Sequence, residues 1–216
     1  MSLTLYFHPL SSFCQKALIA LYENDTAFTP HFVDLMDKAQ NAAFKKIWPV
    51  GKFPVLRDEV AACTIPESTS IIEYLARHHP GPVKLVPEDP NAAVEARAQD
   101  RFFDFSVHLP MQKVIGDRIR PAGKNDAFGV EQAKTALQAA LGIADAMMAE
   151  RTWAAGNAFG MADCAAAPAL FYINMAVAPL AGTYDNAAAY LDRLSKRPSF
   201  ARALAEAEPY LKYVPR

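Results

Sequence analysis

The chain has 216 residues, of which 52% are apolar, and 22 lysines and arginines against 23 aspartates and glutamates give a formal charge of −1. This length allows two modest domains, and the balanced charge excludes the basic footprint of a nucleic-acid-binding protein. No segment offers the ~18 uninterrupted apolar residues of a membrane-spanning helix, and no basic stretch followed by an apolar run opens the chain. We therefore expect a cytoplasmic protein with no membrane or nucleic-acid partner.

The first eighty residues alternate between strand and helix patterns. Residues 3–7 predict a short buried strand, and residues 13–23 predict an amphipathic helix after a loop. Ser11 or Ser12 stands at the start of this helix. A hydroxyl there either caps the helix, worth ~1 kcal/mol, or donates a hydrogen bond to an anion held at the same terminus. The full order β-α-β-α-β-β-α predicts a mixed sheet flanked by helices.

A proline interrupts the chain just before the third predicted strand, in Phe53-Pro54-Val55. Proline cannot donate to a strand ladder, so Pro54 indicates a turn or a cis bond, with an edge strand and a trans proline as the alternative. In a turn or cis arrangement, the N–H and C=O of Phe53 face outward. An extended peptide can then pair with that backbone.

The next helix begins at Pro66-Glu67-Ser68. Proline suits a first helical turn, where its missing N–H is not needed. The free N–H groups and the helix dipole attract a carboxylate, the Ser68 hydroxyl adds a donor, and Glu67 can hold an ammonium group. One α-amino acid head group satisfies both, so the pattern predicts a receptor for a small zwitterionic peptide. An ordinary helix cap with a solvent-facing Glu67 is the alternative.

Prolines and a glycine between residues 79 and 90 interrupt helical periodicity and predict a linker. Beyond it we expect helices over 91–119, 126–150, 161–178, 186–195 and 198–206, and a ligand in the cleft between the two domains. Phe105, His108 and Gln112 follow i, i+3, i+7 spacing and should share one stripe of the first of these helices.

The three cysteines, Cys14, Cys63 and Cys164, lie in apolar contexts and predict buried thiols. Their spacing fits neither a metal site nor a disulfide framework, so no metal is expected. Ser11-Ser12-Phe13-Cys14 has the frame of a C-x-x-C redox motif with serine at the attacking position. A dithiol cycle cannot run there.

On these residues the chain resembles a cytosolic glutathione transferase of the serine type, with likeness to the theta, tau and zeta classes, over nearly its whole length. The resemblance implies a thioredoxin-like domain with a mixed four-stranded sheet (residues 1–80), a linker (81–90) and an all-helical bundle (91–216). It also implies glutathione as co-substrate, a small electrophilic substrate, a role in detoxification and a homodimer.

The resemblance assigns roles to individual residues. Ser11 takes the catalytic position, with Ser12 as the competing hydroxyl, and we favour Ser11 because Lys16 then lies where serine-type members carry a basic residue. The implied glutathione-binding residues are Ser12, Lys52, Phe53, Pro54, Glu67 and Ser68, and those expected for the second substrate are Leu10, Phe105, His108 and Gln112. Asp163 matches an aspartate at a buried helix start, where Gly160 replaces the usual Ser or Thr.

The expected chemistry is activation of a thiol. A thiol with a pKa of about 8.5 is only a few per cent thiolate at pH 7, and the thiolate is the nucleophile. Lowering that pKa by two units takes about 2.7 kcal/mol, which a serine hydroxyl and a helix N-terminus can provide. Two alternatives stay open: a glutathione-dependent isomerase, because Ser11 to Lys16 partly resembles the Ser-Ser-Cys-x-x-Arg pattern of the zeta class, and a binding or regulatory protein without turnover.

Overall fold

The computed structural model describes residues 2–215. The N-terminal part contains all the predicted elements in the predicted order. They are β1 (Leu3–Phe7), α1 (Ser12–Glu23), β2 (Thr29–Phe32), α2 (Lys38–Ile47), β3 (Val55–Asp58), β4 (Cys63–Pro66) and α3 (Ser68–His78).

The four strands form one mixed sheet in the order β2-β1-β3-β4, which confirms the thioredoxin-like prediction. β1 is parallel to β2 and antiparallel to β3, and β3 is antiparallel to β4. Tyr6 on β1 lies opposite Val55, and Val55 lies opposite Pro66 on β4. The loop after β1, the segment before β3 and the segment after β4 therefore leave the sheet at the same end.

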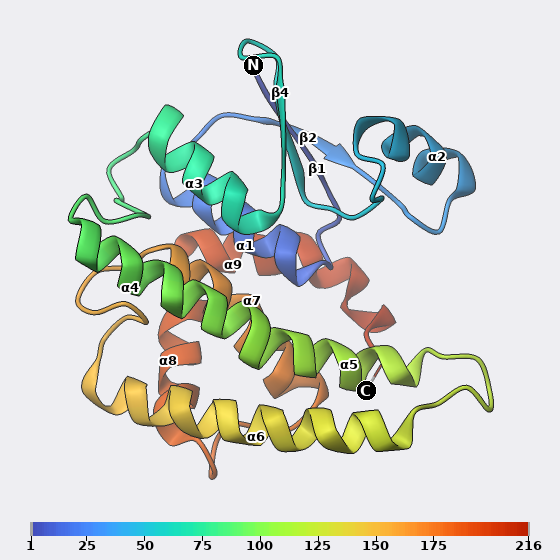
Figure 1. The fold of residues 1–216 in the computed structure, drawn as a ribbon, viewed down its shortest axis with the longest axis vertical. Coiled ribbons are helices and arrows are strands. Elements are labelled where there is room, and N and C mark those ends of the chain that lie inside the picture. The colour runs from blue at the N-terminus through green and yellow to red at the C-terminus, as the bar shows by residue number, and fades with distance from the viewer. Residues whose placement is uncertain (1, 216) are drawn as a thin grey trace.

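The second part of the described chain is helical, as predicted. It contains α4 (Pro90–Arg101), a π-helical segment η1 (Phe102–His108), α5 (Leu109–Arg118), α6 (Ala127–Glu150), α7 (Met161–Ala176), α8 (Asp185–Ser195), α9 (Pro198–Ala207) and a 3₁₀ segment η2 (Glu208–Tyr213). In Figure 1, α4 and α5 form one long rod that runs beside α6. Within residues 2–215, no helix is both long and apolar enough to cross a bilayer.

The rod of α4, η1 and α5 is not the regular helix predicted over residues 91–119. At its centre, the Leu109 N–H donates to the carbonyl of Asp104, a spacing of five residues. This wider turn holds more residues than an α-turn, so positions three apart no longer overlay. The predicted shared stripe is therefore wrong: Phe105 is 55% exposed, whereas His108 is 1% exposed.

Helix α1 lies at the centre of the molecule, between the sheet and the C-terminal helices (Figure 1). It packs against α3 of its own domain and against α7 and α9 of the other. Residues 17–21 of α1 are fully buried, and one continuous apolar core runs through both domains. Residues 165–169 of α7 are mostly alanine, and these small side chains let the backbone of α7 approach the neighbouring helices closely. The two domains therefore share a core rather than a thin interface.

The N-cap residue of helix α7 is Gly160, which has no side chain to accept a hydrogen bond, so another residue must satisfy this helix start. Asp163, which is fully buried, accepts hydrogen bonds from the N–H of Gly160 at 2.8 Å, from the N–H of Ala154 at 2.9 Å and from the Tyr190 hydroxyl. A Cβ at position 160 would lie 3.0 Å from the carbonyl oxygen of Leu85. That contact explains the glycine, and Asp163 satisfies the helix start in its place.

The cysteines are all free, but only two of them are buried as predicted. Burial raises the pKa of Cys14 to about 12, and it also raises the pKa of Cys164. Cys63, near the exposed end of the sheet, is only partly buried and donates to the Tyr74 hydroxyl across 3.5 Å. The prediction of a buried thiol was wrong for Cys63, because β4 is an edge strand.

Candidate active site between the two domains

Most of the residues expected to hold glutathione lie at one end of the sheet, where β1 and β4 end and β3 begins. Phe53-Pro54 is a cis peptide directly before β3, and Glu67 and Ser68 directly follow β4. Ser11 lies at the end of the loop that leaves β1. Because β1, β3 and β4 are neighbours with aligned ends, the structure brings these three segments side by side.

The backbone of Phe53 is open to a partner. Across residues 2–215, neither its N–H nor its C=O makes a backbone hydrogen bond. Its side chain is anchored, since the ring packs on the core and lies 6.2 Å from the ring of His8. Lys52, just before it, is exposed. This segment therefore offers one donor, one acceptor and a nearby cation.

The N-terminus of α3 is uncapped by its own side chain. Glu67, the N-cap residue, has a φ of 67°, a left-handed conformation that is unusual outside glycine, and its carboxylate makes no capping hydrogen bond. Ser68, the first helical residue, is only 4% exposed. The first N–H groups of α3 thus remain available to an anion beside a carboxylate.

Ser11 caps α1, which confirms one of the two sequence interpretations. Its Oγ accepts a hydrogen bond from the N–H of Cys14 at 3.3 Å. A serine hydroxyl has one donor and two acceptor positions, so capping leaves the hydroxyl hydrogen free. Capping and donation to an anion are therefore compatible rather than exclusive.

The hydroxyl of Ser12, unlike that of Ser11, has its partner in the second domain. Its Oγ lies 2.7 Å from Nε2 of His108, whose ring stacks on Phe13 with centroids 4.1 Å apart. Burial lowers the pKa of His108 to about 4; the nearby Asp104 carboxylate opposes this effect, and Lys16 adds to it. His108 is therefore a neutral imidazole at pH 7.

A cavity of about 500 Å³ opens beside the two serines. Its walls come from α5 and from the C-terminal segment, and they are mainly apolar, with Met111, Ile115, Ile119, Val214 and Pro215 among them. The polar groups at this cavity belong to serine, glutamine and tyrosine, and no charged side chain lines it among residues 2–215.

The structure separates the four residues expected for the second substrate. Leu10 and Gln112 line the cavity. His108 lies behind Ser12, and Phe105 lines another groove, between η1 and α6. Phe105 and His108 are thus not brought to the cavity wall, because the π-helical turn rotates them out of register with Gln112.

Sequence reasoning missed Tyr172 on α7, which lines the cavity and anchors the loop before Ser11. Its hydroxyl donates to the carbonyl of Leu10 at 2.7 Å, and Gln15 donates to the carbonyl of Pro9 at 2.9 Å. Gln15 also donates to the Tyr172 hydroxyl at 3.1 Å. No local signal marks a tyrosine in the middle of an alanine-rich helix as a loop anchor.

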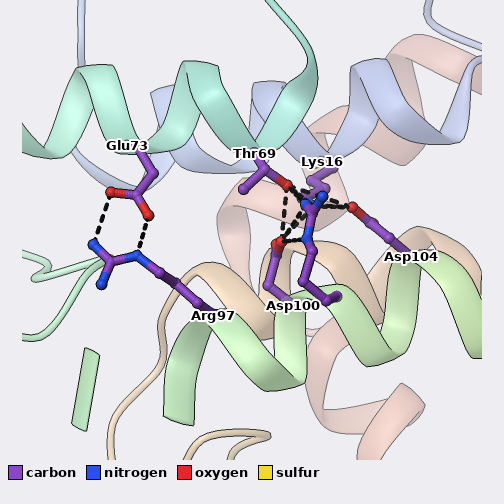
Figure 2. A network of polar contacts seen from close by, with 7 residues as sticks. Lys16, Thr69, Glu73, Arg97, Asp100 and Asp104 are labelled. Carbon is purple, nitrogen blue, oxygen red and sulfur yellow. Dashed lines mark hydrogen bonds and ion pairs between the residues drawn. The ribbon is translucent and has the colours of Figure 1, made fainter. Parts of the chain in front are cut away.

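A buried ionic network links the two helix starts of this site to the second domain. Figure 2 shows Lys16 of α1 and Thr69 of α3 converging on Asp100 and Asp104. Lys16 Nζ lies 2.6 Å from Asp100 Oδ1 and 2.8 Å from both Asp104 Oδ2 and Thr69 Oγ1. Arg101 bridges the same carboxylates from the surface side. Lys16, which matches a basic residue of serine-type transferases, is therefore paired inside the protein and links the two domains.

Comparison with known proteins gives the family. Residues 5–83 match the model described as glutathione S-transferase, N-terminal domain, and residues 105–198 match the glutathione S-transferase, C-terminal domain. FtsZ-localized protein A of Caulobacter vibrioides is 27% identical over 96% of this chain and 93% of its own. Glutathione S-transferase hmp2 of Hypomyces subiculosus is 26% identical over 96% of this chain and 100% of its own.

A solved structure supports the same assignment of the fold. The crystal structure of a glutathione S-transferase from Methylobacillus flagellatus, with GSH bound, has a TM-score of 0.85 at 24% identity and covers 94% of this chain and 98% of that one. Both domain models name one family, and together they span most of the sequence. The chain therefore belongs to the glutathione S-transferase family.

Proposed function

We propose that the protein is a glutathione transferase that binds glutathione across one end of its sheet and activates the thiol at the start of α1. The observation that carries this proposal is that Ser11, Phe53-Pro54 and Glu67-Ser68 lie in segments at the same end of three neighbouring strands. Three strands span about 10 Å, and three fully extended residues also span about 10 Å. The row of groups matches an extended tripeptide in length.

Each part of glutathione has a chemical partner in this row. The γ-glutamyl carboxylate is received by the uncapped N–H groups of α3 and the Ser68 hydroxyl, and the ammonium group by Glu67. The cysteinyl backbone pairs with the N–H and C=O of Phe53, which make no backbone hydrogen bond within residues 2–215. Lys52 is placed to attract the glycyl carboxylate.

The sulfur is assigned to Ser11, because that hydroxyl combines a free hydrogen with the field of a helix N-terminus. A hydrogen bond from a neutral donor to an anion contributes about 1.5–3 kcal/mol, comparable with the roughly 2.7 kcal/mol needed to lower the thiol pKa by two units. The thiolate then attacks an electrophilic carbon. A C–S bond forms, and either a leaving group departs or a double bond takes up the electron pair.

The second substrate is a small neutral apolar electrophile. The cavity beside Ser11 has aliphatic walls and room for a drug-sized molecule. The nearby arginines are already engaged: Arg118 donates to the carbonyls of Ala176 and Pro215, and Arg120 pairs with Asp117. A glutathione-dependent isomerase acting on an anionic diacid is disfavoured on this ground.

A second candidate is a binding or regulatory protein that keeps the fold without turnover. The relative that favours it is FtsZ-localized protein A, to which this chain is similar over nearly its whole length. Retention of Ser11, Pro54, Glu67 and Ser68 in one aligned row favours the enzyme.

We also propose a cytoplasmic homodimer. Three free cysteines suit a reducing compartment. Phe128 is 76% exposed and Ile143 is 60% exposed, and they line adjoining grooves of about 460 and 450 Å³ along α6. A second copy of the chain is the occupant that this face fits, in an isologous contact. Sedimentation equilibrium tests the state, and Phe128→Glu should shift it toward monomer.

The activity is tested by glutathione affinity, measured calorimetrically, followed by titration of the bound thiol through its thiolate absorbance in the ultraviolet. Wild-type protein should bind glutathione with the thiol pKa lowered. Ser11→Ala should keep binding but raise that pKa by about one to two units, as expected for loss of one charge-assisted hydrogen bond. Ser11→Thr, which keeps a hydroxyl and a cap, is the matched control.

Three results would redirect the proposal. No binding at millimolar glutathione would rule out a glutathione enzyme. Binding with an unshifted thiol pKa would favour the regulatory candidate. An unchanged pKa in Ser11→Ala would move the donor to Ser12. A panel of aromatic halides, organic peroxides and cis-alkene diacids then identifies the electrophile class.

A further inference from the structure

His108 is a buried imidazole that the proposed chemistry does not use. It is 1% exposed and does not line the cavity, but its Nε2 lies 2.7 Å from the Oγ of Ser12, which does. Its ring is held parallel to Phe13, with an angle of 13° between the planes. A ring fixed on one face by stacking and at one nitrogen by a hydroxyl has a defined orientation.

The spacing of Asp104 and His108 on η1 explains how His108 reaches Ser12. These two residues are four apart, and both face α1. On α1, Ser12 and Lys16 are also four apart. Lys16 pairs with Asp104 at 2.8 Å, and Ser12 pairs with His108 at 2.7 Å. One ion pair and one hydrogen bond therefore hold the first turns of α1 against η1.

The Ser12–His108 hydrogen bond has two chemical forms. When the Ser12 hydroxyl donates to an unprotonated Nε2, only lone pairs of Oγ remain for the cavity. When a protonated Nε2 donates to Ser12, the hydroxyl hydrogen is free to point into the cavity. Within residues 2–215, Ser12 Oγ has no other side-chain partner. The nitrogen that carries the single ring proton thus decides whether Ser12 faces the cavity as an acceptor or a donor.

We propose that His108 is a positioning residue for the thiolate: its Nε2–H donates to Ser12, which turns the Ser12 hydroxyl toward the sulfur beside Ser11. This inference rests on the proposed function, because glutathione is the ligand whose sulfur selects that form. A hydrogen bond to an anion is about twice as strong as one between neutral groups, so the thiolate favours the donor form of Ser12. The resulting chain, from His108 to Ser12 to sulfur, is polarised along its length.

His108 takes up no extra proton in this scheme. Its charged neighbours are Asp104 on η1 and Lys16 on α1, and in its buried position it stays a neutral imidazole at pH 7. The proton lost by the thiol goes to solvent, and His108 carries one ring proton before and after. Its contribution is to direct a hydroxyl, not to act as a base.

The test is a double-mutant cycle on the pKa of the bound thiol, with glutathione as the ligand. His108→Phe keeps a ring against Phe13 but has no donor, so the thiol pKa should rise by about half to one unit. Ser12→Ala should raise it at least as much. The double variant should match Ser12→Ala alone, because His108 acts only through Ser12.

A structural role for His108 gives a different pattern. Equal pKa values in wild type and His108→Phe, a lowered pKa in His108→Phe, or additive effects in the double variant would overturn the inference while leaving the proposed function intact. His108→Gln, whose amide can donate to Ser12, should restore the wild-type value, and failure to restore it counts against the inference.

A spectroscopic readout needs no variant that alters folding. Long-range proton–nitrogen correlation spectra of the wild-type complex with glutathione should show the His108 ring protonated at Nε2. Protonation at Nδ1 in the complex would overturn the inference. Absence of any glutathione binding would overturn the proposed function, and this inference with it.

Discussion

Lys16→Met is the perturbation whose outcome the structure defines most sharply. Methionine keeps the length and apolar stem of lysine and removes its charge. Lys16 is 1% exposed, and it holds the carboxylates of Asp100, which is fully buried, and Asp104, which is 6% exposed. In the variant both carboxylates stay buried, and within residues 2–215 Arg101, itself 42% exposed, is the one cation that still pairs with them.

Removing one partner from a buried ion pair costs about 3–5 kcal/mol, because the other charge is left without compensation. Arg101 keeps contact with both carboxylates, so we expect the lower end, about 3 kcal/mol. For a chain of this length, that corresponds to a fall in melting temperature of about 6–12 °C. Urea unfolding, followed by circular dichroism and analysed at unchanged slope, measures the loss directly.

The matched control is Arg97→Met, which breaks an exposed ion pair between α3 and α4. Arg97 pairs with Glu73 through two hydrogen bonds, as Figure 2 shows, but it is 46% exposed. An exposed pair contributes about 0–1 kcal/mol, so this variant should be nearly as stable as wild type. If Lys16→Met costs no more than Arg97→Met, the reasoning from burial is refuted.

Three further predictions follow from the same contacts. Burial lowers the pKa of His108 from 6.5 to about 4, so between these pH values the unfolded chain binds a proton that the folded chain does not. The free energy of unfolding should therefore fall by up to about 3 kcal/mol as the pH drops through this window. His108→Gln should flatten the pH dependence of urea unfolding. Asp163→Asn should destabilise the protein by about 2–4 kcal/mol in the same assay, since an amide N–H would face a backbone donor; Gly160→Ser should bring no compensating gain, because of the Leu85 carbonyl. Gln112→Leu should leave glutathione affinity unchanged in calorimetry while lowering the KM for apolar electrophiles, and an altered glutathione affinity would place Gln112 in the wrong subsite.

Much of the fold was predictable because its determinants are local. Ser11 as a helix cap, the proline-marked segment before β3 and the helix start after Pro66 all depend on residues adjacent in the chain. The helices of the second part begin and end within a few residues of their predicted bounds, since Asp, Gly and Pro at their ends act through the backbone.

The exception was the π-helical turn at residues 102–108, and it shows the limit of periodicity. A stripe at i, i+3, i+7 assumes an unbroken α-helix, and the extra residue per turn sends Phe105 to a surface groove and His108 to the core. The one local signal is Pro110, two residues after this turn: it has no N–H to donate and marks an irregularity in the helix, but it does not specify a π-helical turn.

Sequence alone determined the elements, the cap on the first helix and the family's set of polar groups, because these depend on neighbours along the chain and on short motifs. Only the tertiary structure decided what those groups meet: Ser12 contacts His108 from 96 positions away, Lys16 is paired inside the protein rather than facing a ligand, and Tyr172 holds the loop before Ser11. The physical reason is burial. A polar side chain removed from water must find its partner in space, and that partner depends on how the two domains pack rather than on the order of residues.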